Sequence, residues 1–122
     1  MNLAYLILTG AAIVANSYAT VADFAKLGFV VKTADQIHVS RSWLPLLGAL
    51  KGAAVVGLLL GLFGEQTIGI AAAGGLVVYF IGAMVAHVGA RVFHNIAYPI
   101  IFLAIAIGCF LTSLSRASLL HG

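Results

Sequence analysis

Three polar side chains, Asn16, Lys51 and His87, interrupt long apolar stretches of the sequence. Asn16 lies seven residues before Asp23, Lys51 lies eight residues after Trp43, and His87 lies close to the end of its own apolar stretch, four residues before a basic residue. At a helical rise of about 1.5 Å per residue, these intervals correspond to depths of about 10, 12 and 6 Å from a polar boundary. Three separate apolar stretches therefore place a polar side chain in one layer.

This polar layer predicts a ligand site. An ionisable residue within a membrane span costs about 2.5 to 3.5 kcal/mol on insertion scales and usually faces the interior of a helix bundle. We therefore expect a small polar pocket that opens toward the cytoplasm. The residues expected to bind a ligand are Asn16, Lys51, Tyr79, His87 and Arg91, with Asp23 and Asn95 near the mouth of the pocket.

The residue types in this layer indicate which head group the pocket would accept. Lys51 and Arg91 would make the pocket cationic and favour an anionic or carbonyl-bearing group. His87 could pass a proton near neutral pH. The alternative is that Lys51 faces lipid and extends its long stem to the membrane interface.

Other residues give weaker signals. His87 and His94 are seven residues apart, but no acidic cluster accompanies them, so no metal site is expected. Cys109 is the single cysteine, which excludes an internal disulfide. Its position in the middle of an apolar stretch is typical of a small buried hydrophobe.

The composition requires a membrane to hold these residues. The 122-residue chain is 63% hydrophobic and 7% charged, whereas soluble domains have roughly 25% charged residues. A span needs about 20 mostly apolar residues, and we expect a single domain with four spans. The predicted fold is an all-α membrane protein, a four-transmembrane-helix bundle with spans at about 2–22, 44–63, 67–93 and 96–114 and a long polar loop at 23–43.

The connections between the spans differ in length. The short "GEQ" sequence at 64–66 predicts a tight turn, so the second and third spans form an antiparallel hairpin. The segment 23–43 mixes apolar and basic residues, and two interpretations stay open. It contains a short interfacial helix at about Phe24 to Val31, or it is an irregular loop.

Small residues at four-residue spacing indicate how the spans pack. The pairs are Gly48 with Gly52, Gly57 with Gly61, Ala71 with Gly75, and Gly82 with Ala86. Small residues let helix backbones approach closely within a membrane. Packing within the bundle is favoured over a contact between two copies of the chain.

The distribution of basic residues predicts the orientation. Lys26, Lys32, Arg41 and Arg91 fall on one side of the four spans, and Arg116 falls on the other side with Glu65. The positive-inside rule places the long loop in the cytoplasm and both termini outside. The net charge of +3 is small and is explained by topology, so no nucleic-acid partner is expected.

Three segments carry a resemblance to a known family: "WLPLLGALKGAAVVGLLLG", "IGIAAAGGLVVYFIGAMVAHVGAR" and "NIAYPIIFLAIAI". Together they resemble the DoxX-like family of small four-helix integral membrane proteins, in particular its short actinobacterial members. The resemblance extends from about Leu3 to Leu114 and implies a four-helix bundle in the bacterial cytoplasmic (inner) membrane. Lys51 stands where many relatives have an acidic residue, so a carboxylate role is not carried over to this position.

The family resemblance implies several classes of function. Founding members are described as subunits of a thiosulfate–quinone oxidoreductase, which implies an accessory protein of quinone- or redox-linked membrane metabolism, with no redox centre of its own. The expected ligand is a non-covalently bound quinone or lipid-like molecule, and whether the chain is an enzyme stays open. The alternative is a non-catalytic assembly or scaffold subunit of a larger membrane complex, and a small-molecule carrier ranks third. The expected partners are membrane lipid and another membrane protein or further copies of the chain.

Overall fold

Four long helices account for the apolar stretches of the chain. The computed structural model describes residues 3–25, 28–36, 38–91, 93 and 96–121. The long helices are α1 (Leu3–Ala25), α3 (Leu44–Leu62), α4 (Gln66–Gly89) and α5 (Ala97–His121). Each is long and apolar enough to cross a membrane, α5 over Ala97–Ser115. Backbone groups in lipid must pair within their own segment, which explains why these stretches are helical.

The helix ends differ from the predicted ends in two places that affect the site. Helix α1 continues past Ala22 to Ala25, so Asp23 lies inside the helix rather than in a loop. Helix α4 ends at Gly89, short of the predicted end at Phe93. Arg91 follows with a positive φ of 57°, a left-handed conformation that does not continue a right-handed helix.

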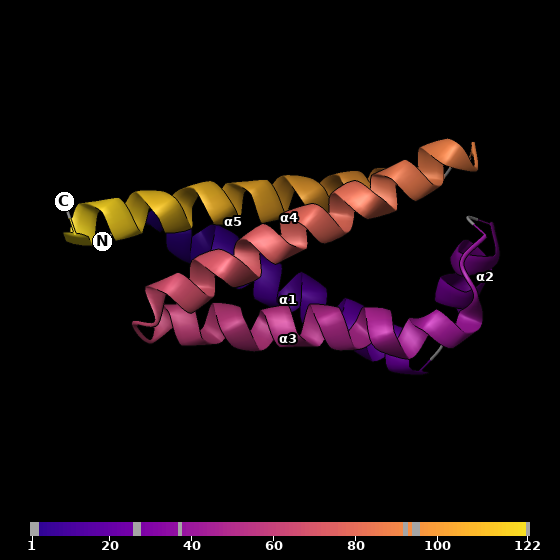
Figure 1. Ribbon diagram of the computed structural model, residues 1–122, viewed down its shortest axis with the longest axis horizontal. Helices are drawn as coiled ribbons and strands as arrows, with labels where there is room; N and C mark the ends of the chain where they lie inside the picture. Colours follow the sequence, from indigo (N-terminus) through magenta and orange to yellow (C-terminus); the bar gives the residue numbers. More distant parts are fainter. Residues whose placement is uncertain (1–2, 26–27, 37, 92, 94–95, 122) are drawn as a thin grey trace.

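The segment 23–43 contains a short helix. Helix α2 (Gly28–Gln36) is followed by a 3-10 turn, η1 (Arg41–Trp43), which leads directly into α3. Of the two interpretations of this segment, the structure has the helix, although it begins downstream of the predicted start at Phe24. Helix α2 lies at the end of the bundle opposite the two chain termini (Figure 1).

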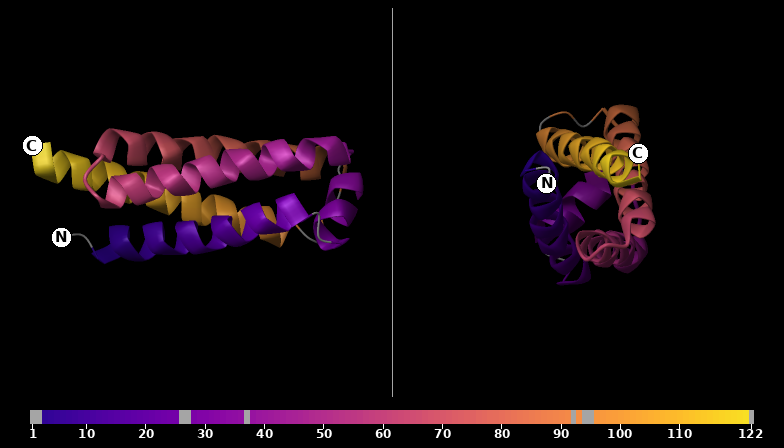
Figure 2. Two further views of the ribbon diagram at one scale, coloured as in Figure 1. Left: turned by 90° about the horizontal axis from the view of Figure 1, so that it is seen from below. Right: turned by 90° about the vertical axis from the view of Figure 1, so that its left-hand side faces the viewer.

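The four long helices form a closed ring of neighbours. Helix α1 packs against α3 and α5, and α4 packs against the same two helices. Both chain ends lie at one end of the bundle, together with the α3–α4 turn (Figures 1 and 2). We call this the turn end, and the opposite end is the α2 end. Gly64 forms the turn with φ of 113°, a conformation that glycine adopts without steric cost.

Close contact between small residues joins α3 to α4 at the turn end. A Cβ atom added to Gly61 would lie 2.8 Å from the Cα atom of Gly69, and one added to Gly57 would lie 2.7 Å from the Cβ atom of Ala72. The predicted pairs of α3 therefore pack inside the bundle. On α4, by contrast, a Cβ added to Gly75 or Gly82 would meet no atom within 4 Å, so these two glycines do not make the predicted contacts within this chain.

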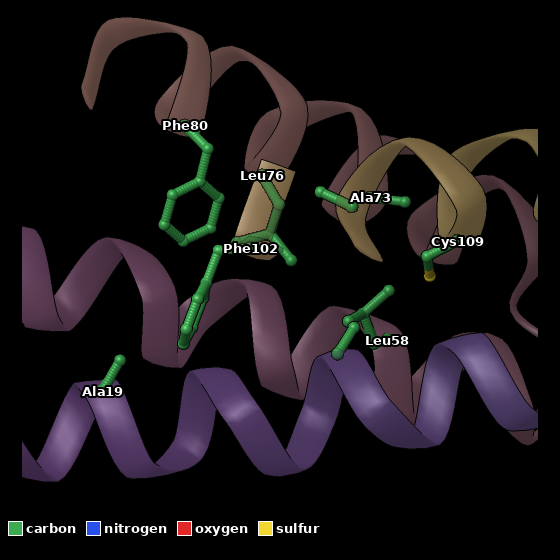
Figure 3. Close-up of a cluster of buried hydrophobic side chains, with 9 residues drawn as sticks. Ala19, Leu58, Ala73, Leu76, Phe80, Phe102 and Cys109 are labelled. Carbon is green, nitrogen blue, oxygen red and sulfur yellow. The ribbon is translucent and has the colours of Figure 1, made fainter. Parts of the chain in front are cut away.

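A cluster of buried side chains fills the middle of the bundle. Figure 3 shows Leu58, Leu76, Phe80, Phe102 and Cys109 directed toward one another from α3, α4 and α5. Many large apolar side chains, such as Val14 and Val78 with 71% exposed, point outward instead. Lipid tails are as apolar as leucine, so this outward surface suits a bilayer and the interior is held by close packing.

Candidate functional site

A buried ion pair joins α1 to α3 near the α2 end. The Lys51 Nζ atom lies 2.6 Å from Asp23 Oδ2, and both side chains are less than a tenth exposed. Gly48 makes room for this contact, because its Cβ position is 3.0 Å from the Cβ atom of Asp23. Because Gly48, one turn before Lys51, has no side chain, α1 can bring the Asp23 carboxylate to the ammonium group.

The Lys51 ammonium also contacts α4. Its Nζ atom lies 5.3 Å from the centre of the Tyr79 ring, within the range of a cation–π interaction. With 6% of the residue exposed, Lys51 is directed into the bundle and not along the lipid-facing surface. Its charge is balanced by Asp23 and lies near the face of an aromatic ring.

His87 presents a buried nitrogen without a hydrogen-bond partner. Its Nδ1 atom lies 2.9 Å from the carbonyl oxygen of Ala83 and donates to it. The Nε2 atom is buried and has no hydrogen-bond partner among the residues that the structure describes. A buried polar atom left unpaired costs about 1 to 3 kcal/mol. The Nε2 atom is therefore available to a bound molecule.

These groups line one cavity at the α2 end. The cavity has a volume of about 280 Å³, nearly twice the roughly 150 Å³ of an engineered apolar cavity that holds benzene. Its size therefore suits a substituted six-membered ring or a head group of similar size. The lining residues come from α1 to α5 and the segment between α2 and η1: Asp23, Thr33, Ala34, Val39, Leu44, Leu47, Lys51, Tyr79, Phe80, Ala83, His87, Tyr98 and Pro99.

The structure brings together some of the residues that the sequence predicts for the site. Lys51, Tyr79 and His87 line the cavity, and Asp23 lines it as well, paired with Lys51 rather than standing apart at a mouth. Asn16 is buried but is not part of the lining, and its Nδ2 atom donates to the Ala12 carbonyl oxygen.

The other two predicted residues do not join this group. Arg91 is exposed and is not part of the cavity lining. The reason is that α4 ends at Gly89, so the spacing of Tyr79 and His87 does not continue to Arg91 on one helical face. Asn95 lies outside the described residues. The lining pairs one basic side chain, Lys51, with one acidic side chain, Asp23, which differs from the predicted cationic pocket.

The sequence did not indicate two aromatic residues that border the cavity. Tyr98 stacks on Phe102 with ring centres 4.6 Å apart, and Phe80 lies 5.2 Å from the same ring. Tyrosine near a helix end is common at membrane interfaces, and phenylalanine is common in any span. Neither residue type by itself signals a site.

The remaining candidates fit structural roles. The part of the chain that the structure describes contains no group of three or more His, Cys, Asp or Glu residues placed to hold a metal ion. Cys109 is fully buried, and its Sγ atom lies 3.5 Å from Thr9 Oγ1. It behaves as a small residue in the interior of the bundle.

The fold defines a class: a multi-pass membrane protein built as a four-helix bundle. At one end of this bundle, Asp23, Lys51 and His87 line a cavity among mostly apolar residues. Within this class the chain belongs to the DoxX-like family, which matches residues 7–109. Comparison with curated proteins and with solved structures gives no match.

Proposed function

We propose that this protein binds the polar head group of a membrane-soluble amphiphile, of quinone or lipid type, and serves as an accessory protein in quinone- or redox-linked membrane metabolism. One observation carries the proposal: the Nε2 atom of His87, which has no hydrogen-bond partner among the described residues, borders the same cavity as the Lys51–Asp23 pair. A polar atom in that position requires a polar partner. Membership of the DoxX-like family is consistent with this role.

The charges in the cavity favour a neutral head group. Lys51 has three N–H donors, and its ammonium pairs with a single carboxylate, that of Asp23. An N–H of this ammonium can be directed at a carbonyl oxygen of the ligand. A neutral His87 accepts a hydrogen bond at Nε2, for example from a hydroxyl group. A ring that carries carbonyl groups in one state and hydroxyl groups in another satisfies both side chains.

This set of side chains can exchange protons with such a ring. An imidazole nitrogen can accept or donate a hydrogen bond, and the ammonium of Lys51 stabilises negative charge on an oxygen atom beside it. Electrons would come from a partner protein. This division of roles is the reason that we propose an accessory protein and not a complete oxidoreductase.

Binding of decylubiquinone to the purified protein tests the proposal. Trp43 is the only tryptophan, and quenching of its fluorescence by the quinone gives Kd. His87→Leu is expected to weaken binding about tenfold, the value of one hydrogen bond of about 1.4 kcal/mol. Arg91→Gln is the matched control, since this exposed residue does not line the cavity, and should leave Kd unchanged. Equal affinity of the wild-type and His87→Leu proteins would contradict the proposal.

The outer face of α4 favours a second candidate, an assembly subunit of a larger membrane complex. Gly75 and Gly82 are exposed and have no neighbour within 4 Å of an added Cβ, which leaves room for a helix of another membrane protein or of a second copy. Cross-linking from Gly75→Cys in a Cys109→Ser background tests this candidate. A product that contains a second polypeptide supports it, and a monomer at every cross-linker length opposes it.

We also propose that the α2 end faces the cytoplasm of a bacterium and that both termini lie outside. Lys32 lies in α2, Arg91 follows the end of α4, and Glu65 lies in the α3–α4 turn; all three are exposed, in line with the positive-inside rule. A C-terminal alkaline phosphatase fusion should be active, because that enzyme needs the periplasm. An inactive phosphatase paired with a fluorescent cytoplasmic reporter would reverse the orientation.

A further inference from the structure

A second hollow adjoins the cavity, between α3 and α4 on the outer surface of the bundle. It has a volume of about 440 Å³ and we call it the lateral groove. Its lining residues are His38, Val39, Ser40, Trp43, Leu47, Leu50, Tyr79, Gly82, Ala83 and Ala86. Four of these also line the cavity, namely Val39, Leu47, Tyr79 and Ala83. The two spaces are therefore neighbours that share a wall of side chains.

The lateral groove follows from the way in which α3 and α4 diverge. The two helices touch at Gly61 and Gly69 near the turn end, and they separate toward the α2 end (Figure 1). Where they separate, α4 presents Gly82 and Ala86 to the groove. A Cβ added to Gly82 would meet no atom within 4 Å, so this part of the groove is open.

The groove opens on an exposed surface that is largely apolar, which lipid tails would cover in a bilayer. Leu50 and Trp43, which line it, are each more than half exposed, and Leu50 and Gly82 belong to helices that can span the membrane. An apolar chain lying here would replace lipid tails without entering water. His38 and Ser40 line the same groove from the segment between α2 and η1.

Helix α2 contributes to the wall of the cavity at its other side. Thr33 and Ala34 of α2 line the cavity, and Ala34 is only 4% exposed. On this side α2 lies between the cavity and water, whereas on the side of the lateral groove only the side chains that line both spaces lie between them. Among the residues that line both spaces, Leu47 of α3 and Tyr79 of α4 have the two large side chains on the long helices.

We propose that the ligand enters the cavity sideways from the bilayer, between α3 and α4, and that its apolar chain stays in the lateral groove while its head group contacts Lys51 and His87. This inference rests on the proposed function and narrows its ligand to an amphiphile with a ring-sized head and a single apolar chain. Tyr79 separates the two spaces and lies near the Lys51 ammonium. Movement of its side chain opens the way between them.

Filling the groove tests this route. Gly82→Leu places a large side chain in the groove, and Gly75→Leu is the matched control. Both glycines are exposed on α4, seven residues apart, and neither has an atom within 4 Å of an added Cβ. Only Gly82 lines the groove. The two substitutions therefore change helix propensity equally and differ in the groove.

Two quinone probes distinguish the contribution of the ligand's alkyl chain to binding from that of its head group. Decylubiquinone carries an alkyl chain, and ubiquinone-0 has the same ring without the chain. Gly82→Leu is expected to weaken decylubiquinone binding about tenfold, an effect of about 1.4 kcal/mol, and to leave the Kd of ubiquinone-0 unchanged. Gly75→Leu should change neither Kd. Thermal unfolding in detergent checks that both variants fold.

The possible results distinguish the route from the site. Loss of decylubiquinone affinity in Gly82→Leu alone, with ubiquinone-0 unaffected, supports the lateral route. Unchanged decylubiquinone affinity, or equal weakening of both probes, overturns it while the head-group site stands. If the wild-type protein binds neither probe, the proposed function and this inference both fail.

Discussion

The two ends of the α3–α4 hairpin are built from the same two helices but are organised in opposite ways. At the turn end, Gly61 and Gly69 bring the backbones into contact. At the α2 end, the helices stand apart, and Lys51 and His87 face the space between them. Small residues let membrane helices pack closely. At the other end the two helices are separated, and a cavity lined by Lys51 and His87 occupies part of the space.

The interactions that stabilise the two ends differ in kind. The turn end depends on van der Waals contact between backbones, which tolerates no added atom. The α2 end depends on the Lys51–Asp23 pair and on the contact between Lys51 and Tyr79. A paired charge in a low-dielectric interior becomes costly when its partner is removed. The two ends should therefore respond differently to substitution.

The largest expected effect is at the ion pair. Lys51→Met should lower the free energy of unfolding by about 3 to 5 kcal/mol, because it leaves Asp23 buried without a counter-charge. The double variant Asp23→Leu/Lys51→Met should recover most of this loss, since two apolar side chains of similar size need no partner. Unfolding in a denaturing detergent, followed by circular dichroism, measures both values.

Comparison of the two single variants with the double variant also tests the direction of the Lys51 side chain. If Lys51 lay along lipid, substituting it would change the free energy of unfolding little, and this change would add to the change caused by Asp23→Leu. Strict additivity of the two single variants would therefore contradict the buried pair. Ser42→Ala is a suitable control, because this exposed residue lies outside both the cavity and the lateral groove.

A smaller effect is expected at the turn end. Gly61→Ala adds a Cβ atom 2.8 Å from the Gly69 Cα atom, so the helices must move apart, at a cost of about 1 to 3 kcal/mol. Gly75→Ala makes the same chemical change at an exposed position with no neighbour within 4 Å. The same unfolding measurement should show a loss for Gly61→Ala alone. Equal stability of the two variants would mean that the close contact is absent.

The smallest effect is expected from added volume in the cavity. Ala83→Val should leave the free energy of unfolding unchanged or raise it by about 0.5 kcal/mol, because the added methyl groups enter open space. Ala73→Val is the comparison in the packed core, where the residue is fully buried, and should cost about 1 to 3 kcal/mol. A loss at Ala83 as large as that at Ala73 would show that the α2 end is packed as tightly as the core.

The membrane-spanning fold could be predicted from local properties of the sequence. The length and hydropathy of four apolar stretches were enough, because a bilayer demands helices of about 20 residues. The predicted turn at 64–66 agrees with the short connection between Leu62 and Gln66. Part of the polar layer could also be predicted, because the depths of Lys51 and His87 along their helices follow from the constant rise per residue.

The partners within the layer required the tertiary structure. From the sequence, Asp23 marked the end of the first span, because an unpaired charge is costly inside a membrane. In the structure α1 continues past Asp23, and Lys51 pairs with its carboxylate. Arg91 looked like a continuation of the helical face of His87, but α4 ends before it. In both cases the position of the helix end depends on a contact with another helix or on a reversal of the chain. The spacing of residues along one helix does not reveal either.

The amino-acid sequence alone determined how many helices cross the membrane and which polar side chains they carry inward. Only the packed bundle decided that Lys51 meets a carboxylate and that Tyr98 lines the same cavity. It also decided that the Nε2 atom of His87 is buried with no partner in the described part of the chain. The physical reason is that hydropathy acts residue by residue along each helix. The distances between helices are set by contacts such as that of Gly61 with Gly69, far away in the bundle.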